Sequence, residues 1–297
     1  MARAAEFHFE TIVVATDLSE ASSSALHYAQ AVAQVHKARV IITHVIDPVG
    51  YAFASGVPVA LGQDKAAIEE IYRMEDETRR KGIPVHSQVE TGVICDRILQ
   101  SVMDARADLL ILGTRARTGA GRAALGTVAR QILARTPCPV LTVPRGSERH
   151  FPRGGGWQRV VIATDFSVAS LEALAYAHRC AFDQLNVVHA EPCRDDREHA
   201  ACMERLRFLA PFNEQHTVPV EHIVDCGEAA DLIIRESARM NADLVVLGAP
   251  IEELQEKDFA SSTVLKVISD VHCPVMCVPS TLEMPMRIEE RRMSVGC

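Results

Sequence analysis

The chain has 297 residues, a formal net charge of −8, and 48% hydrophobic against 24% charged residues. Its length predicts two globular domains, and the acidic balance argues against broad electrostatic attraction to nucleic acid or to an anionic membrane. No apolar run approaches the ~18 residues of a membrane span, and the N-terminus lacks the apolar core of a secretory signal, so we expect a cytoplasmic protein.

Short apolar runs alternate with longer helical patterns along the first half of the chain. Five of these runs predict strands: residues 12–16, 40–45, 85–89, 109–113 and 140–143. Uninterrupted apolar runs suit parallel strands that are covered on both faces, and their alternation with helices predicts an open, doubly wound α/β sheet. Ser19 stands where the first predicted helix needs an N-cap, and Ser167 does so in the second half.

The sequence contains a long internal repeat. Residues 12–17, IVVATD, recur as 160–165, VVIATD, and residues 107–113, ADLLILG, recur as 242–248, ADLVVLG. The offset falls from 148 to 135 residues between these two matches, so the second copy is 13 residues shorter in its middle. A repeat of this length indicates two related domains rather than a short-repeat solenoid. We therefore expect a first domain at 1–146, a linker rich in glycine and polar residues at 147–157, a second domain at 158–280 and a C-terminal tail at 281–297.

In a doubly wound sheet, ligands bind outside the carboxyl ends of the strands, where the strand order reverses. The first predicted strand ends at Asp17, whose carboxylate could contact a ribose or a base edge, or could cap the following helix. The fourth ends at Gly113 and opens into GTRARTGAGRAALGT, residues 113–127, with four glycines, three arginines and no acidic residue. Glycine lets backbone N–H groups approach a phosphate closely, and the helix expected near Thr127 adds unpaired N–H donors. The segment is therefore either a phosphate cradle or a solvated surface loop.

These segments resemble the universal stress protein family. Its ATP-binding members carry the motif G-x2-G-x9-G-[ST] after the fourth strand, and this chain places Gly113, Ala116, Gly126 and Thr127 at the four motif positions. The opening segment IVVATDLSEASSSAL is similar to the family as well, and the resemblance extends over nearly all of residues 8–280. It implies two tandem domains of the adenine nucleotide α-hydrolase-like fold. Each would be an open, mostly parallel sheet of the five strands, with helices on both faces.

The resemblance also implies which residues would hold a nucleotide, and charge adds three more. Ala15, Thr16 and Asp17 would contact the nucleoside, and the backbone at Val45 would contact the adenine. Leu112 and Gly113 would line the ribose or the α-phosphate, and Gly126, Thr127 and Val128 would hold the phosphates. From charge alone, and not from the resemblance, we add Arg115, Arg117 and Arg122. The expected ligand is ATP, or else ADP or AMP, with or without Mg²⁺. Ala116 departs from the motif. If this position needs a positive φ, alanine costs about 1–2 kcal/mol, which would weaken binding.

The second copy departs further from the motif. Its equivalent segment, GAPIEELQEKDFASS at 248–262, has a formal charge of −3 where the first has +3, and Ile251 and Ser261 occupy two of the motif's glycine positions. A polyphosphate beside this acidic segment would be repelled, so we expect no ATP there, although Asp165 is retained. The resemblance implies that the last strands of the two copies meet, which would make the second copy a built-in dimer partner. We expect two chains to form a homodimer, the commonest assembly.

Two further patterns are weaker. His189, Cys193, His199 and Cys202 are residue types that bind zinc, but their spacing matches no zinc-site signature, and we expect no metal. The segment GAGRAA at 119–124 satisfies the dinucleotide fingerprint, but it lies past the fourth predicted strand and not directly after the first.

The function that we expect is regulatory. Adenine nucleotide bound to the first domain of a stress-response protein would set its conformation or its choice of an unidentified protein partner. The alternative hypotheses are a weak ATPase or nucleotidyl-transfer enzyme, and a structural protein with both sites inactive. An enzyme needs a base or a metal-binding carboxylate near the phosphates, and residues 113–127 contain neither. Binding is therefore favoured over turnover, and no catalytic residue is assigned.

Overall fold

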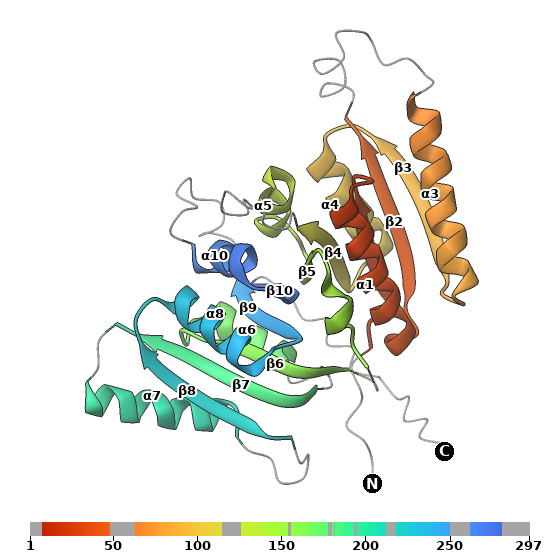
Figure 1. The fold of residues 1–297 in the computed structure, drawn as a ribbon. Helices are drawn as coiled ribbons and strands as arrows, with labels where there is room; N and C mark the ends of the chain where they lie inside the picture. Colours follow the sequence, from red (N-terminus) through yellow and green to blue (C-terminus); the bar gives the residue numbers. More distant parts are fainter. Residues whose placement is uncertain are drawn as a thin grey trace, which may run out of the picture.

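The structure is a computed structural model, and it describes residues 8–47, 63–114, 126–153, 156–177, 180, 182–192, 195–211, 218–249 and 262–280. Its ten strands form one sheet in the order β3-β2-β1-β4-β5-β10-β9-β6-β7-β8. Figure 1 shows this sheet running from β3, in orange, to β8, in teal, with helices along it. We call β1–β5 with their helices the first half and β6–β10 with theirs the second half. The predicted tail at 281–297 lies outside the described residues.

The first half is a parallel sheet with the reversal in strand order between β1 and β4. Its elements are β1 (Thr11–Thr16), α1 (Glu20–His36), β2 (Arg39–Ile46), α3 (Gln63–Arg80), β3 (Val85–Thr91), α4 (Ile94–Ala105), β4 (Leu109–Thr114), α5 (Thr127–Leu133) and β5 (Val140–Pro144). All the pairings among these strands are parallel. All six residues of β1 are buried, as expected for a strand that is covered on both faces.

The second half repeats this arrangement. Its elements are β6 (Trp157–Ala163), α6 (Val168–Ala177), β7 (Phe182–Glu191), α7 (Asp196–Leu209), β8 (Val220–Cys226), α8 (Ala229–Met240), β9 (Leu244–Ala249), α10 (Thr263–Asp270) and β10 (Val275–Pro279). A short 3-10 helix, η1 (Ser147–His150), precedes it. The pairings among its strands are again parallel. The predicted α/β fold with two doubly wound, mostly parallel sheets is therefore confirmed.

The two halves join through their last strands. β5 and β10 pair antiparallel, and Leu141 lies opposite Met276. These two residues are also equivalent in the repeat, because they are separated by the offset of 135. A local two-fold relation between the halves therefore passes through this pair. Both side chains are fully buried, so the join is part of the core.

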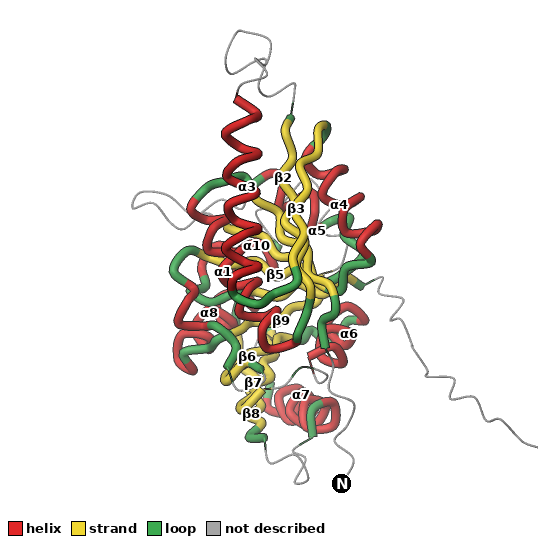
Figure 2. Tube along the Cα trace, turned by 90° about the vertical axis from the view of Figure 1, so that its right-hand side faces the viewer, coloured by secondary structure: helices red, strands yellow, loops and turns green. Residues whose placement is uncertain are grey.

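Two hydrophobic cores lie on opposite faces of the sheet. One contains side chains of α1, α3, α6 and α7, and the other contains side chains of α4, α5, α8 and α10. Each core includes residues from both halves. Figure 2 shows the strands running through the middle of the molecule with helices on both sides. In the part of the chain that the structure describes, no helix is long and apolar enough to cross a membrane.

A buried hydrogen-bond chain ties the first half to the start of the second. Trp157, at the start of β6, donates its Nε1–H to the Tyr28 hydroxyl at 2.7 Å, and that hydroxyl donates to the carbonyl oxygen of His150 at 2.8 Å. All three residues are buried. His150 in turn donates from Nδ1 to Asp243 at 3.3 Å. Residues of the predicted linker therefore pack into the core and satisfy buried polar groups.

We predict that Tyr28→Phe destabilises the protein by about 1–3 kcal/mol, because the buried Trp157 N–H loses its acceptor. Urea unfolding followed by the fluorescence of Trp157, the single tryptophan of the chain, measures this change. Tyr72→Phe is the matched control, because Tyr72 is 61% exposed, and it should shift stability by less than about 0.5 kcal/mol. Equal stability of the two variants would contradict the role of this hydrogen bond.

Candidate functional site

A strained turn connects β1 to α1. Leu18 has φ 64°, a left-handed conformation that is unusual for a bulky residue and that clusters at functional sites. Thr16 Oγ1 accepts the N–H of Leu18 at 3.0 Å, and Asp17 Oδ1 accepts the N–H of Ser19 at 3.0 Å. The turn thereby holds the exposed Asp17 side chain at the carboxyl end of β1.

Side chains from α1 and β2 brace this turn. Ser19 Oγ accepts the N–H of Ser22 at 3.3 Å, which confirms Ser19 as the N-cap of α1. The Thr16 hydroxyl donates to Ser22 Oγ at 2.9 Å, and His44 Nδ1 donates to the Thr16 carbonyl oxygen at 2.8 Å. The hydroxyl of Thr16 is thus buried and engaged within the protein. Sequence reasoning missed Leu18, Ser22 and His44.

Asp17 is ionised at neutral pH. Burial alone would raise the pKa of its carboxyl group, but hydrogen bonds, chiefly from the side chain and backbone of Ser19, hold this pKa below its ordinary value. One oxygen of the carboxylate serves the turn by accepting the Ser19 N–H. Asp17 therefore has a local structural role at the start of α1, which was the alternative to ligand binding. It leaves an exposed negative charge at the point where the strand order reverses.

Glycine is needed at position 113 for packing. A Cβ atom there would lie 2.4 Å from the carbonyl oxygen of Ala21, in the first turn of α1. A Cβ atom at Gly126 would meet no atom of the described structure within 4 Å, and Gly126 has φ −57°, which any residue can adopt. The two motif glycines therefore differ: packing requires Gly113, whereas no described atom crowds Gly126, which is the N-cap residue of α5.

The structure gathers several predicted site residues at one edge of the sheet. Ala15 and Leu112 are paired neighbours on β1 and β4, and Val45 is the penultimate residue of β2. Thr127 is exposed at the first position of α5, the predicted helix start, and Val128 packs against the core beside it. Arg115, Ala116, Arg117 and Arg122 lie outside the described residues.

The second half contains the same turn. Phe166 has φ 63°, and Asp165 Oδ1 accepts the N–H of Ser167 at 2.9 Å. His189 Nδ1 donates to the Thr164 carbonyl oxygen at 2.9 Å, as His44 does in the first half. A Cβ atom at Gly248 would lie 2.4 Å from the backbone of α6. The second half therefore repeats the geometry that the first half has at its strand ends, including the strained residue with positive φ.

A family model described as the universal stress protein family matches residues 8–144 and 156–279. The chain belongs to this family. A universal stress protein from Thermus aquaticus is 32% identical over 143 residues, which are 46% of this chain and 98% of that protein. One from Methanocaldococcus jannaschii is 28% identical over 147 residues, 46% of this chain and 83% of the relative. Each of these relatives thus spans about half of the chain.

Solved structures of universal stress proteins show the same fold across both halves. The crystal structure of a universal stress protein from Archaeoglobus fulgidus superposes with a TM-score of 0.73 at 18% identity, covering 91% of this chain and 98% of that one. A Pseudomonas aeruginosa protein described as a putative universal stress protein has a TM-score of 0.59 at 17% identity and covers 91% of this chain and 93% of its own. The tandem arrangement of two universal stress protein repeats is therefore established.

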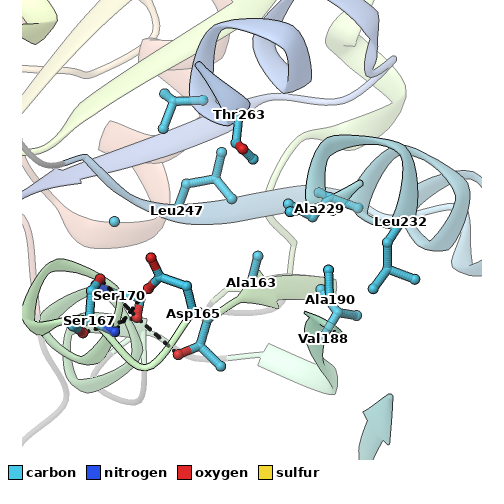
Figure 3. Close-up of a pocket in the computed structure, with 14 residues that line it drawn as sticks. Ala163, Asp165, Ser167, Ser170, Val188, Ala190, Ala229, Leu232, Leu247 and Thr263 are labelled. Atoms are coloured by element: carbon cyan, nitrogen blue, oxygen red, sulfur yellow. Dashed lines mark hydrogen bonds between the residues drawn. The ribbon is translucent and has the colours of Figure 1, made fainter. Parts of the chain in front are cut away.

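The universal stress protein turn of the second half borders a cavity of about 120 Å³. Figure 3 shows Asp165 with Ser167 and Ser170 on one side of this cavity, and Ala190, Ala229 and Leu232 on the other. Gly248 and Leu247, the equivalents of Gly113 and Leu112, also line it. The cavity therefore occupies the position in the second half that corresponds to the predicted site of the first.

In this universal stress protein, the two histidines among the candidate metal residues have polar partners within the protein. His189 bonds to the Thr164 carbonyl oxygen, and His199 Nδ1 lies 3.0 Å from Glu191 Oε1. Cys193 lies outside the described residues. Among the residues that are described, there is no group of three or more histidine, cysteine, aspartate or glutamate side chains that could hold a metal ion.

We predict that Gly113→Ala destabilises the protein by about 1–3 kcal/mol, because the new methyl group overlaps the backbone of α1. The same substitution at Gly126 is the matched control. It should cost less than about 1 kcal/mol, since the added atom meets no described atom and only the N-cap preference for glycine over alanine is lost. Urea unfolding of both variants, followed by Trp157 fluorescence, tests the contrast. A Gly126→Ala variant as unstable as Gly113→Ala would refute the distinction between the two glycines.

Proposed function

We propose that the first half binds an adenine nucleotide, ATP or its products ADP and AMP, and that the protein acts as a nucleotide-responsive stress protein. The observation that carries this proposal is the placement of Asp17. Its ionised carboxylate lies at the carboxyl end of β1, beside β4, where the strand order reverses. Ribose hydroxyl groups donate strong hydrogen bonds to such a carboxylate.

The segment after β4 supports a phosphate site next to this carboxylate. Residues 113–127 carry three arginines and no acidic residue, which favours an anion. Gly126 is exposed at the end of this segment and has open space at its Cβ position. A small residue at that place leaves room for a phosphate against the backbone. Gly126 is also the N-cap residue of α5, a position at which glycine is favoured over alanine.

Binding is favoured over catalysis because Asp17 is a poor base. Burial would raise the pKa of its carboxyl group, but hydrogen bonds from Ser19 hold this pKa below the ordinary value. An efficient general base has a pKa near the pH at which it works. Hydrolysis of a bound nucleotide would therefore be slow.

We further propose that the second half serves as the pairing partner of the first. Its β10 occupies the free edge of β5, so two chains that form a homodimer must use another surface. The proposed location is the cytoplasm. Burial raises the pKa of Cys138, Cys273 and Cys277 to about 12, and such thiols are unreactive. This supports cysteines that stay reduced.

Calorimetric titration of nucleotide-stripped protein with Mg-ATP should give one site per chain. Asp17→Asn should weaken this binding about tenfold or more, because a charged hydrogen-bond acceptor is lost while its shape is kept. Asp183→Asn is the matched control: Asp183 is exposed near the start of β7, in the other half of the molecule, and its loss should leave the affinity unchanged. Two sites per chain, or no binding at millimolar ATP, would contradict the proposal.

A further inference from the structure

Six of the side chains that line the cavity of the second half differ from their equivalents in the first half, and three of these changes remove bulk or charge. At the position of Val45 the second half has Ala190, and at the position of Ile94 it has Ala229, so these two side chains are smaller. At the position of Arg97, whose Nε donates to the Thr91 carbonyl oxygen, it has the buried Leu232. Together these three changes remove side-chain volume and a cation, while the strained turn with its aspartate is retained.

The cavity has the size and the surface of a site for a flat, weakly polar ring. Its volume of about 120 Å³ corresponds to about ten water-sized groups, roughly the size of a purine. Ala190, Ala229, Leu232 and Leu247 supply apolar walls, which are typical of small-molecule pockets with a few placed polar groups. Figure 3 shows Asp165, Ser167 and Ser170 together on the side opposite to Ala229 and Leu232, with Thr263 apart from them.

The charge of the cavity is negative. Burial alone would raise the pKa of Asp165, but hydrogen bonds, chiefly from the side chain and backbone of Ser167, keep it below the ordinary value. No lysine or arginine is among the described residues that line the cavity. In the sequence, the segment after β9 carries four acidic residues and one lysine, and all five lie outside the described part of the chain. A phosphate group would therefore meet the negative charge of Asp165 with no basic side chain among the described residues of the lining.

We propose that this cavity is a second ligand site with the opposite charge preference: it binds a nucleoside whose 5′ end is uncharged or cationic, and it rejects phosphate. The base would lie against the apolar wall at Ala190, Ala229 and Leu232, and the ribose hydroxyls would donate to Asp165. This inference rests on the proposed function, because the ribose role of Asp165 follows from that of Asp17. One chain would then take a nucleotide in its first half and a phosphate-free nucleoside in its second.

The test is a calorimetric titration of the Asp17→Asn full-length protein with three probes: adenosine, 5′-amino-5′-deoxyadenosine and AMP. In this background the affinity of the first half is lowered, and the binding that a further Asp165→Asn substitution removes belongs to the second half. Adenosine and the 5′-amino nucleoside should bind, and AMP should bind at least about tenfold more weakly than adenosine. Adding Asp165→Asn should weaken adenosine binding at least about tenfold. The asparagine oxygen still accepts the Ser167 N–H, so the turn is kept.

A charge-restoring variant tests the preference itself. Leu232→Arg gives the second half the cation that the first half has at Arg97, and it should shift the ratio of AMP to adenosine affinity at least about tenfold towards AMP. Ala238→Arg is the matched control, because Ala238 is exposed on the same helix and does not line the cavity. An equal shift in both variants would indicate an effect of net charge alone and would overturn the inference.

The outcomes separate this inference from the proposed function. Adenosine binding that Asp17→Asn removes and Asp165→Asn spares would place the nucleoside in the first half and overturn the inference. AMP binding that depends on Asp165 and is as tight as that of adenosine, or no adenosine binding at millimolar concentration, would also overturn it. If ATP fails to bind the wild-type first half while adenosine binding still depends on Asp165, the proposed function fails and the second-half site stands.

Discussion

The antiparallel pairing of β5 with β10 is the contact on which the rest of the molecule depends. Each of these strands is apolar and buried, and a free edge of that kind invites aggregation. Pairing them joins two five-stranded sheets into one and lets each hydrophobic core extend through both halves. The Trp157–Tyr28–His150 hydrogen bonds act at the same join. A chain built this way keeps its two copies joined through one sheet, so their sequences can diverge while they stay paired.

The divergence has affected the surroundings of the site more than its framework. Both halves keep a bulky residue at positive φ, an aspartate that accepts a backbone N–H, and a glycine against which the helix packs closely. The second half keeps this strained turn although its following segment has lost the basic, glycine-rich character of the first. The turn and the segment that follows the fourth strand of each half are therefore separable parts. Changes in side-chain size and in charge, at Ala190, Ala229 and Leu232, are among the differences between the strand ends of the two halves.

Several features were predictable because they depend on residues close together in the chain. The strands, the N-cap at Ser19 and the internal repeat follow from local apolar patterns and short-range hydrogen bonding. Gly113 is a case where local reasoning was incomplete. The motif suggests a place beside a ligand, but the structure shows that α1, a distant element in the chain, approaches this residue too closely for a side chain. The bracing of Thr16 by His44 was missed for the same reason, since β2 supplies it across the sheet.

By itself, the sequence determined the fold class, the duplication and the opposite charges of the two segments that follow β4 and β9, because composition and periodicity encode these directly. Only the tertiary structure decided how the halves meet, that residues of the predicted linker are buried, and that a cavity lies beside Asp165. These properties arise from contacts between residues that are far apart in the chain. Their geometry depends on how helices and strands pack together, and no local pattern specifies that packing.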